Sequence, residues 1–156
     1  MIRALTLTVF LSAAIGFVGC GSDSRELESL TPAPVSGEPS FGDVKLASEI
    51  DQATKAPITE VTSFPSDAQA MHATISVKNV PAGSEFLFRW TKGAAEAGTI
   101  AVTVVADTAD SWVAGSIFPN GQVPPGDDWL LAVFYNGKTI ASVAFIVEPA
   151  AGQPPG

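Results

Sequence analysis

The sequence predicts an all-β fold in which antiparallel strands form a sandwich. Short apolar runs recur over residues 44–149, separated by Pro, Gly, Asn and Asp, and none keeps a helical period over three turns. The run at 70–78 alternates between apolar and polar residues, as a half-buried strand does. Asn136-Gly137 separates two β-prone runs, which favours a hairpin with a type I′ turn, because both turn positions need positive φ.

The first expected strands are partly broken by proline. Residues 44–50 (VKLASEI) predict the first strand. Pro57 and Pro65 make the next segment edge-like, and Phe64 within it is expected to plug the core. In 70–78 one side of the strand is expected to face the core and the other to face solvent. The inward set is Met71, Ala73, Ile75 and Val77, and the outward set is His72, Thr74, Ser76 and Lys78.

The later strands are longer and more apolar. Residues 85–91 (EFLFRWT) are expected to point Phe86, Phe88 and Trp90 inward. We expect a loop at 92–98, a strand at 99–106, a turn at 107–110 and a strand at 112–118 that Gly115 weakens. A long connection at 119–127 then leads into the hairpin strands 129–135 and 138–147.

The number and spacing of these strands match an immunoglobulin-like antiparallel β-sandwich of about seven strands. Trp90 lies where such sandwiches often bury a tryptophan, and the single cysteine leaves no inter-sheet disulfide. The layout from Asn79-Val80-Pro81-Ala82-Gly83 through Trp90 and Pro125-Gly126 to the Tyr135-Asn136-Gly137-Lys138 hairpin and Phe145-Ile146-Val147 resembles uncharacterised bacterial exported domains. Its motifs are structural, so the resemblance implies a fold and not an activity.

Composition limits the possible functions. The 156 residues allow one ordinary domain, and 46% hydrophobic with 15% charged residues is too apolar for a disordered chain and too interrupted for a multispan membrane protein. The net charge is −8, and removal of residues 1–19 would leave 7 basic against 16 acidic residues, or −9. Because an acidic surface repels phosphate, the sequence argues against nucleic-acid binding.

The N-terminus is typical of a secretory signal peptide at residues 1–19. Arg3 supplies a positive charge, and residues 4–16 form an apolar run of 13 residues, too short to span ~30 Å at about 1.5 Å per helical residue. The small residue Gly19 follows the run and is itself followed by Cys20, the only cysteine. An ordinary signal peptide with an incidental cysteine remains an alternative.

Phe17-Val18-Gly19-Cys20 resembles the lipobox of bacterial lipoproteins, although leucine is commoner than phenylalanine at the first position. The resemblance implies cleavage between Gly19 and Cys20, attachment of a diacylglyceryl group to the Cys20 thiol, and frequent acylation of the new amine. Two or more acyl chains give stable membrane anchoring where one does not. Gly21 rather than aspartate after the cysteine favours the outer membrane, facing the periplasm, if the host is Gram-negative.

Two segments predict little structure of their own. Residues 20–43 comprise the cysteine and a stretch dominated by Ser, Pro, Gly and Glu, which cannot bury enough surface to offset its ordering entropy. We expect a flexible linker there, a folded domain over 44–149, and a disordered tail over 150–156.

Few residues suggest chemistry. His72 is the only histidine and is expected to lie on the surface, without a second histidine or a free cysteine for a zinc site. Asp127-Asp128 and the Asp107/Asp110 pair fit solvated turns better than metal ligands or an acid/base pair. We therefore expect no enzymatic activity, no catalytic residue, no metal and no cofactor.

One surface is expected to form an interface. If alternate residues of the last two strands face the core, apolar side chains remain on the outer side of their sheet. These are Leu87, Leu130, Phe134, Ile140 and Ile146. Such a patch often marks contact with a partner protein or a second copy. Alternatively, the N-terminal segment or the 92–98 loop covers it, or the register differs by one residue.

These observations favour a lipid-anchored cell-envelope protein that acts as a non-catalytic binding or assembly module. A first alternative is a carbohydrate- or small-ligand-binding module, for which Trp112 is the candidate if it points outward. A second alternative is an accessory subunit of an envelope enzyme or transport complex.

Overall fold

The structure, a computed structural model, describes residues 34–152, and this part of the chain is all-β. Its nine strands are β1 (Ser40–Ile50), β2 (Pro57–Val61), β3 (Ser63–Pro65), β4 (Met71–Val80), β5 (Glu85–Lys92), β6 (Ala95–Thr103), β7 (Thr108–Ile117), β8 (Gly126–Tyr135) and β9 (Lys138–Glu148). The all-β prediction is confirmed. The number exceeds the predicted seven because the proline-containing segment forms two short strands, β2 and β3.

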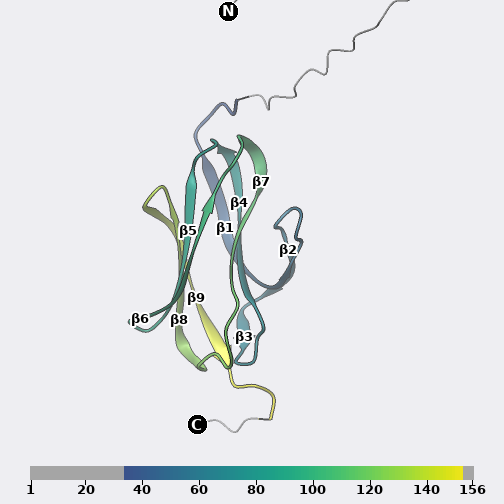
Figure 1. Cartoon of the computed structure of the whole chain (residues 1–156), viewed down its shortest axis with the longest axis vertical. Coiled ribbons are helices and arrows are strands. Elements are labelled where there is room, and N and C mark those ends of the chain that lie inside the picture. The colour runs from purple at the N-terminus through teal and green to yellow at the C-terminus, as the bar shows by residue number, and fades with distance from the viewer. Residues whose placement is uncertain (1–33, 153–156) are drawn as a thin grey trace, which may run out of the picture. The chain divides into compact units, whose positions relative to one another are not determined.

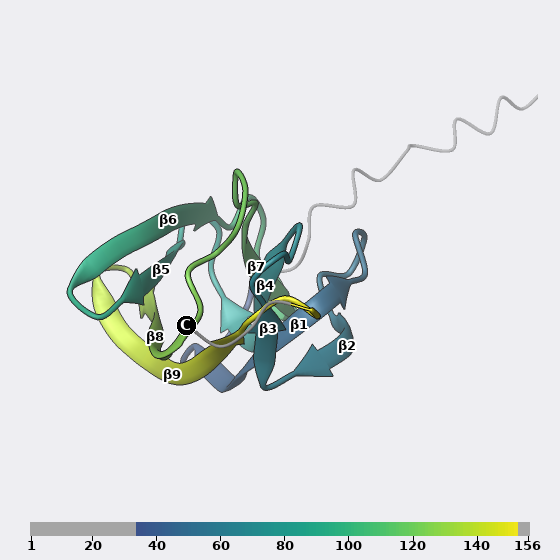
Figure 2. The same cartoon turned by 90° about the horizontal axis from the view of Figure 1, so that it is seen from below.

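The strands form two layers, visible in Figures 1 and 2. One sheet has the order β2-β1-β4-β7 and the other has the order β3-β9-β8-β5-β6. The chain passes from one sheet to the other between β2 and β3, β3 and β4, β4 and β5, β6 and β7, and β7 and β8, as in a two-sheet β-sandwich. Neighbouring strands are antiparallel except β3 and β9, which pair in parallel at one edge.

The core lies between the sheets and contains the residues that the alternation predicted. The inward sides of β4 and β5 are fully buried, including Trp90. Phe64 on β3 is buried as the predicted plug, and its ring lies 6.5 Å from that of Trp90 and 5.7 Å from that of Phe145. Each large apolar side chain that is fully buried contributes about 1.5–3 kcal/mol.

Two predicted loops are strands. Residues 92–98 were expected to form a loop, but Gly93 and Ala94 alone form the turn and β6 begins at Ala95. Its Ala and Gly residues have low β-propensity, and pairing with β5 overrides it. The predicted turn at 107–110 overlaps β7, which pairs with β4 from Thr108 onward.

The domain begins earlier than predicted. β1 starts at Ser40 rather than residue 44, because the Phe41 ring packs 4.8 Å from that of Tyr135 and 5.9 Å from that of Phe86. The Val35 amide also donates to Asp107 Oδ2 at 3.3 Å. Residues 34–43 of the predicted linker therefore contact the domain. The predicted signal peptide and the rest of the linker lie outside the described residues.

One turn follows the sequence expectation, and two contacts go beyond it. Asn136 and Gly137 have φ values of 46° and 80°, as the type I′ hairpin prediction requires. A Cβ at Gly115 would collide with the Phe88 ring, so this glycine allows the two sheets to approach. At the C-terminal end the Ala150 amide donates to Ser66 Oγ at 2.9 Å, so the first residue of the predicted disordered tail is held by the domain.

Candidate interaction surfaces

The outer face of the five-stranded sheet exposes two of the predicted apolar residues. Leu130 on β8 is 41% exposed and Ile146 on β9 is 48% exposed. Leu130 lies between Thr91 of β5 and Ala144 of β9 in the same cross-strand row. The side chains around it are therefore small or β-branched, and Leu130 stands above them.

Leu87 and Phe134 also lie on this face, directly opposite each other on β5 and β8, and both are half-buried. The Arg89 guanidinium lies 5.0 Å from the centre of the Phe134 ring, within cation–π range. Glu96 Oε2 lies 3.7 Å from Arg89 Nε. The one cation of this region is thus paired with an acid and rests on an aromatic ring.

The prediction for Ile140 is wrong. A register shift between Val133 and Phe134 places Val133 opposite Ala141 and Phe134 opposite Thr139. Ile140 falls at this bulge and packs, half-buried, against the core. Strict alternation from Phe145 could not show this, because one extra residue reverses the faces beyond it.

The central rows of this face carry no uncompensated charge. Arg89 and Glu96 are the charged residues in the three cross-strand rows centred on β5 and β8. The other members of those rows are apolar, small or hydroxyl-bearing: Leu87, Ala101, Phe134 and Thr139; Thr99, Ala132 and Ser142; Thr91, Leu130 and Ala144. For a chain with a net charge of −8, this is a locally neutral surface.

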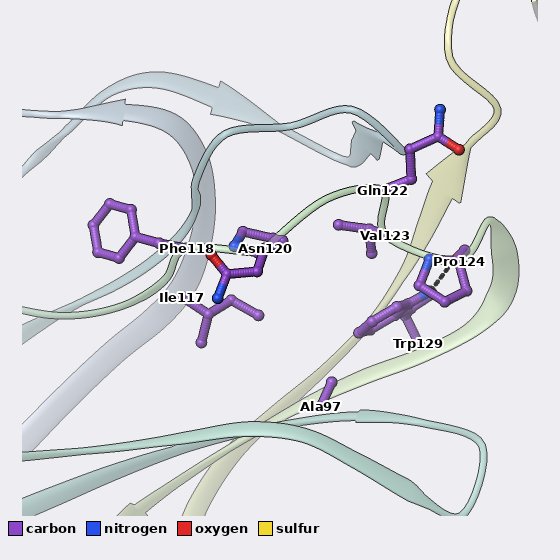
Figure 3. A pocket seen from close by; sticks show the side chains of 9 residues that line it. Ala97, Ile117, Phe118, Asn120, Gln122, Val123, Pro124 and Trp129 are labelled. Atoms are coloured by element: carbon purple, nitrogen blue, oxygen red, sulfur yellow. Dashed lines mark hydrogen bonds between the residues drawn. The ribbon is translucent and has the colours of Figure 1, made fainter.

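A hollow of about 280 Å³ opens where β7 and β8 are joined (Figure 3). Ile117, Val123, Trp129 and Ala97 surround it, and the Asn120 amide lies beside Ile117 at its rim. None of its lining residues is charged. The connection is held near its β8 end, because the Val123 amide donates to Ser66 O at 2.7 Å and Trp129 Nε1 donates to Pro124 O at 3.0 Å.

Two exposed apolar side chains were not singled out from the sequence. Phe118, at the start of that connection, is 69% exposed, and Val105, between β6 and β7, is 93% exposed. Both lie near the ends of the predicted strands 99–106 and 112–118. β6 ends three residues and β7 one residue earlier than expected, which leaves these side chains outside the strands, and no local signal marks those ends.

Trp112 is not a free aromatic platform. It lies on the outer face of β7, opposite Ser76 of β4, and is half-buried. It borders a second hollow, of about 300 Å³, together with Lys55 and Val105. Trp112 was a candidate sugar-binding residue only if its ring points outward. The ring lies on the outer face but is half-buried, so this condition is only partly met.

His72 is buried, not on the surface as predicted, with 8% of its area exposed. Its Nδ1 lies 2.6 Å from Ser116 Oγ, and its ring meets the edge of Phe118 at 6.2 Å between centroids. Burial lowers the pKa of His72. No described carboxylate forms an ion pair with it, so the Ser116–His72 pair lacks the third group that orients the base of a catalytic triad.

The aspartates have structural partners. Lys92 Nζ lies 2.6 Å from Asp128 Oδ1, and this hydrogen bond lowers the pKa of Asp128. Asp107 accepts from the Ala82 amide at 2.8 Å, in addition to the Val35 amide. Within residues 34–152 no group of three or more His, Cys, Asp and Glu residues is arranged to hold a metal ion.

No known family model matches the chain, and no curated protein matches it.

Over residues 34–152 there is no helix of the length and apolarity needed to cross a membrane. Leu87, Leu130, Phe134 and Ile146 are thus brought together on one surface, whereas Cys20 and Gly19 lie outside the described residues.

Proposed function

We propose that this chain is an exported, lipid-anchored protein of the cell envelope that acts as a non-catalytic binding or assembly module. Its membrane attachment would be the lipid on Cys20, after cleavage behind Gly19. The support for attachment is the N-terminal sequence, in which a charged residue, a short apolar run, a small residue and the only cysteine follow in order. The support for a binding role is a surface of the domain.

The observation that carries the binding role is the neutral outer face around Leu130 and Ile146. Exposed apolar residues at the centre of a patch, with charges paired or displaced to the rim, are typical of protein interfaces. Here Arg89 is neutralised by Glu96, while most acids of the chain lie elsewhere. A protein partner that buries Leu130 would therefore desolvate little unpaired charge.

Crosslinking of the full chain in its own membranes, followed by mass spectrometry, tests both parts. Three variants are compared with wild type: Cys20→Ser, Phe134→Asp and Ile58→Asp. Ile58 is an exposed apolar residue of β2 in the other sheet, so it is a matched control for adding an acid to the surface. Labelled palmitate reports lipidation in the same cells.

We expect Cys20→Ser to lose the palmitate label and the membrane association. Phe134→Asp should keep both but lose a stoichiometric crosslinked partner, which Ile58→Asp should retain. A membrane-bound, unlabelled wild-type protein would contradict the lipid anchor. Partner capture that is equal in Phe134→Asp and wild type would contradict the binding face, whatever the result for Cys20.

The hollow beside Trp129 favours a second candidate function, the binding of an uncharged small ligand such as a sugar. Its walls are apolar, its rim carries the Asn120 amide, and its connection is fixed by two hydrogen bonds before any ligand arrives. Tryptophan fluorescence that shifts with saccharides in wild type but not in Trp129→Phe would favour it. A role as accessory subunit would instead give a constant enzyme or transporter companion in the crosslinking experiment.

A further inference from the structure

The two open sides of the sandwich differ in their edge strands. On one side, β2 has five residues and begins with Pro57, and β3 has three residues and ends with Pro65. On the other side, β6 has nine residues and β7 has ten, and neither contains proline or lysine. Short edges, proline and lysine are the usual protections against pairing with another strand. The β6/β7 side therefore lacks protections that the other side has.

β7 is the better of the two unprotected edges. It ends the sheet beside β4 (Figure 1), and its outer row of backbone groups has no strand partner among the described residues. Its single charge, Asp110, lies 3.6 Å from Lys78 of β4. β6, by contrast, has Ala95, Ala97 and Gly98 among its first four residues, and these have low β-propensity.

The two most exposed large apolar residues lie at opposite ends of β7. Val105 stands three residues before its first residue and Phe118 directly follows its last. The hollow lined by Val105, Thr108 and Trp112 adjoins the first half of the strand. An added antiparallel strand with an apolar side chain just beyond its end would bring that side chain to Val105.

We infer that two copies of this chain associate through β7, which pairs antiparallel with β7 of the second copy about a two-fold axis at Trp112. Residues that face each other across an antiparallel pair share one side of the sheet, so some residue must lie opposite its own copy, with the axis midway between the two. With Trp112 opposite itself, Phe118 of each copy lies opposite Ala106 of the other, beside Val105. The contact is thus self-complementary, as a two-fold interface requires.

The charges agree with this pairing. Asp110 of one copy lies opposite Ala114 of the other, so no acid faces an acid although the chain is strongly acidic. Trp112 meets its own counterpart, and aromatic cross-strand pairs are among the favourable ones. The N-terminal residues 20–33 fit the edge less well, because they include Asp23, Arg25, Glu26 and Glu28. A second copy is therefore the occupant that the edge favours.

Disulfide crosslinking in membranes tests the pairing, using the full chain. Cys20 is the only native cysteine, so wild type is the background control. Trp112→Cys places one thiol on each side of the axis, where facing Cα atoms are about 4.5–5.5 Å apart, within the range of about 4.4–6.8 Å that disulfides span. Ser76→Cys is the matched control, since it occupies the same cross-strand row and outer face, one strand further from the edge.

We expect a disulfide-linked dimer from Trp112→Cys and none above background from Ser76→Cys. Equal crosslinking of the two variants, or none from Trp112→Cys, would overturn the proposal. A charge pair at one position gives a second test, by sedimentation of the full chain in density-matched detergent. Ala114→Asp puts an acid opposite Asp110, and Ala114→Lys puts a cation there.

The dimer of Ala114→Asp should dissociate at least about tenfold more readily than that of Ala114→Lys. Equal dissociation constants for the two variants would exclude the β7 contact. A wild type that stays monomeric up to ~100 μM would exclude it too, because with a Kd of about 1 μM the chain would be mostly dimer at that concentration. Leu130→Asp should leave the dimer unchanged, since the face proposed for partner capture is in the other sheet. Loss of the dimer in Leu130→Asp would move the contact to that face and overturn the β7 pairing.

Discussion

The outer faces of the two sheets contrast in an unexpected way. On the four-stranded sheet the outer side of β4 carries polar His72 and Thr74, and both are buried. On the five-stranded sheet the outer side carries apolar Leu130 and Ile146, and both are exposed. Alternation tells which residues share a face of a strand. It does not tell which face later segments of the chain will cover.

Apolar residues of the two strands beside β4 lie next to its polar face. Ala47 and Ile50 of β1 are buried but do not belong to the inter-sheet core. Trp112 is the diagonal neighbour of Thr74 on β7, and Phe118 packs against His72. These residues come from β1 and from the β7 region, two distant parts of the chain, so their convergence beside β4 depends on the whole fold.

The turn between β1 and β2 also reaches the region of Trp112. Asp51 Oδ1 accepts hydrogen bonds from the Ala53 and Thr54 amides at 2.9 and 2.6 Å, and these bonds lower the pKa of Asp51. The turn brings Lys55, with a φ of 63°, to the hollow beside Trp112. The turn therefore brings a residue from the opposite edge of the sheet to the hollow beside β7, a contact that the sequence does not suggest.

The largest effect is expected from a charge at Thr74. Its side chain is fully buried and its Oγ1 has no hydrogen-bond partner among the described residues. Thr74→Asp should destabilise the domain by about 3 kcal/mol or more, because a carboxylate there would be buried and unpaired. Urea unfolding gives the change directly. Thr99→Asp, on the exposed side of β6 opposite Arg89, should change stability by less than ~0.5 kcal/mol.

Thr74→Val tests the same burial of Thr74, but it is expected to stabilise the domain. Because it removes an unsatisfied buried hydroxyl at nearly constant volume, it should raise the free energy of unfolding by about 1 kcal/mol. A loss of stability in Thr74→Val, or equal effects of the two aspartate substitutions, would show that the outer face of β4 is open in solution.

Local pattern predicts much of the fold. The alternation of β4 and β5 identifies the core, and Asn136-Gly137 identifies the final hairpin. The parts that it misses depend on contacts between distant segments. β6 is held by pairing with β5 despite its Ala and Gly residues, and Phe41 extends β1 because two aromatic rings from the other sheet meet it.

The apolar outer face of the five-stranded sheet was also predictable only in part. Leu130 and Ile146 follow from a period of two on long strands. Ile140 does not, since a bulge has no reliable sequence signal here. The exposure of Phe118 depends on where β7 ends and on the hydrogen bond from Val123 to Ser66, which joins segments more than fifty residues apart.

The next effect is a pH dependence from His72. Burial lowers its folded-state pKa below 6.5, so between that lowered pKa and about 6.5 the unfolded chain binds more protons than the folded one. Stability should therefore be constant above pH 6.5 and fall as the pH decreases below it, by at most about 1.4 kcal/mol per pH unit. Unfolding measured from pH 7.5 to 5 tests this.

His72→Gln should remove the dependence in that range. Asp51 and Asp128 do not interfere, because their pKa values are lowered from 3.8 and their contributions are lost only at more acidic pH. A slope that persists in His72→Gln would assign the titration to another group and show that His72 is hydrated.

The smallest effect on stability is expected on the exposed apolar face. Leu130→Ser and Ile146→Ser each remove a side chain whose exposed part already contacts water, so each should cost about 1 kcal/mol or less in urea unfolding. Leu131→Ser, one residue along β8 and fully buried, is the matched control and should cost several times more. If Leu130→Ser were as costly as Leu131→Ser, another segment of the chain would have to cover this face in solution. Substitutions with a small effect on folding and a large effect on partner capture would mean that Leu130 and Ile146 serve binding rather than stability.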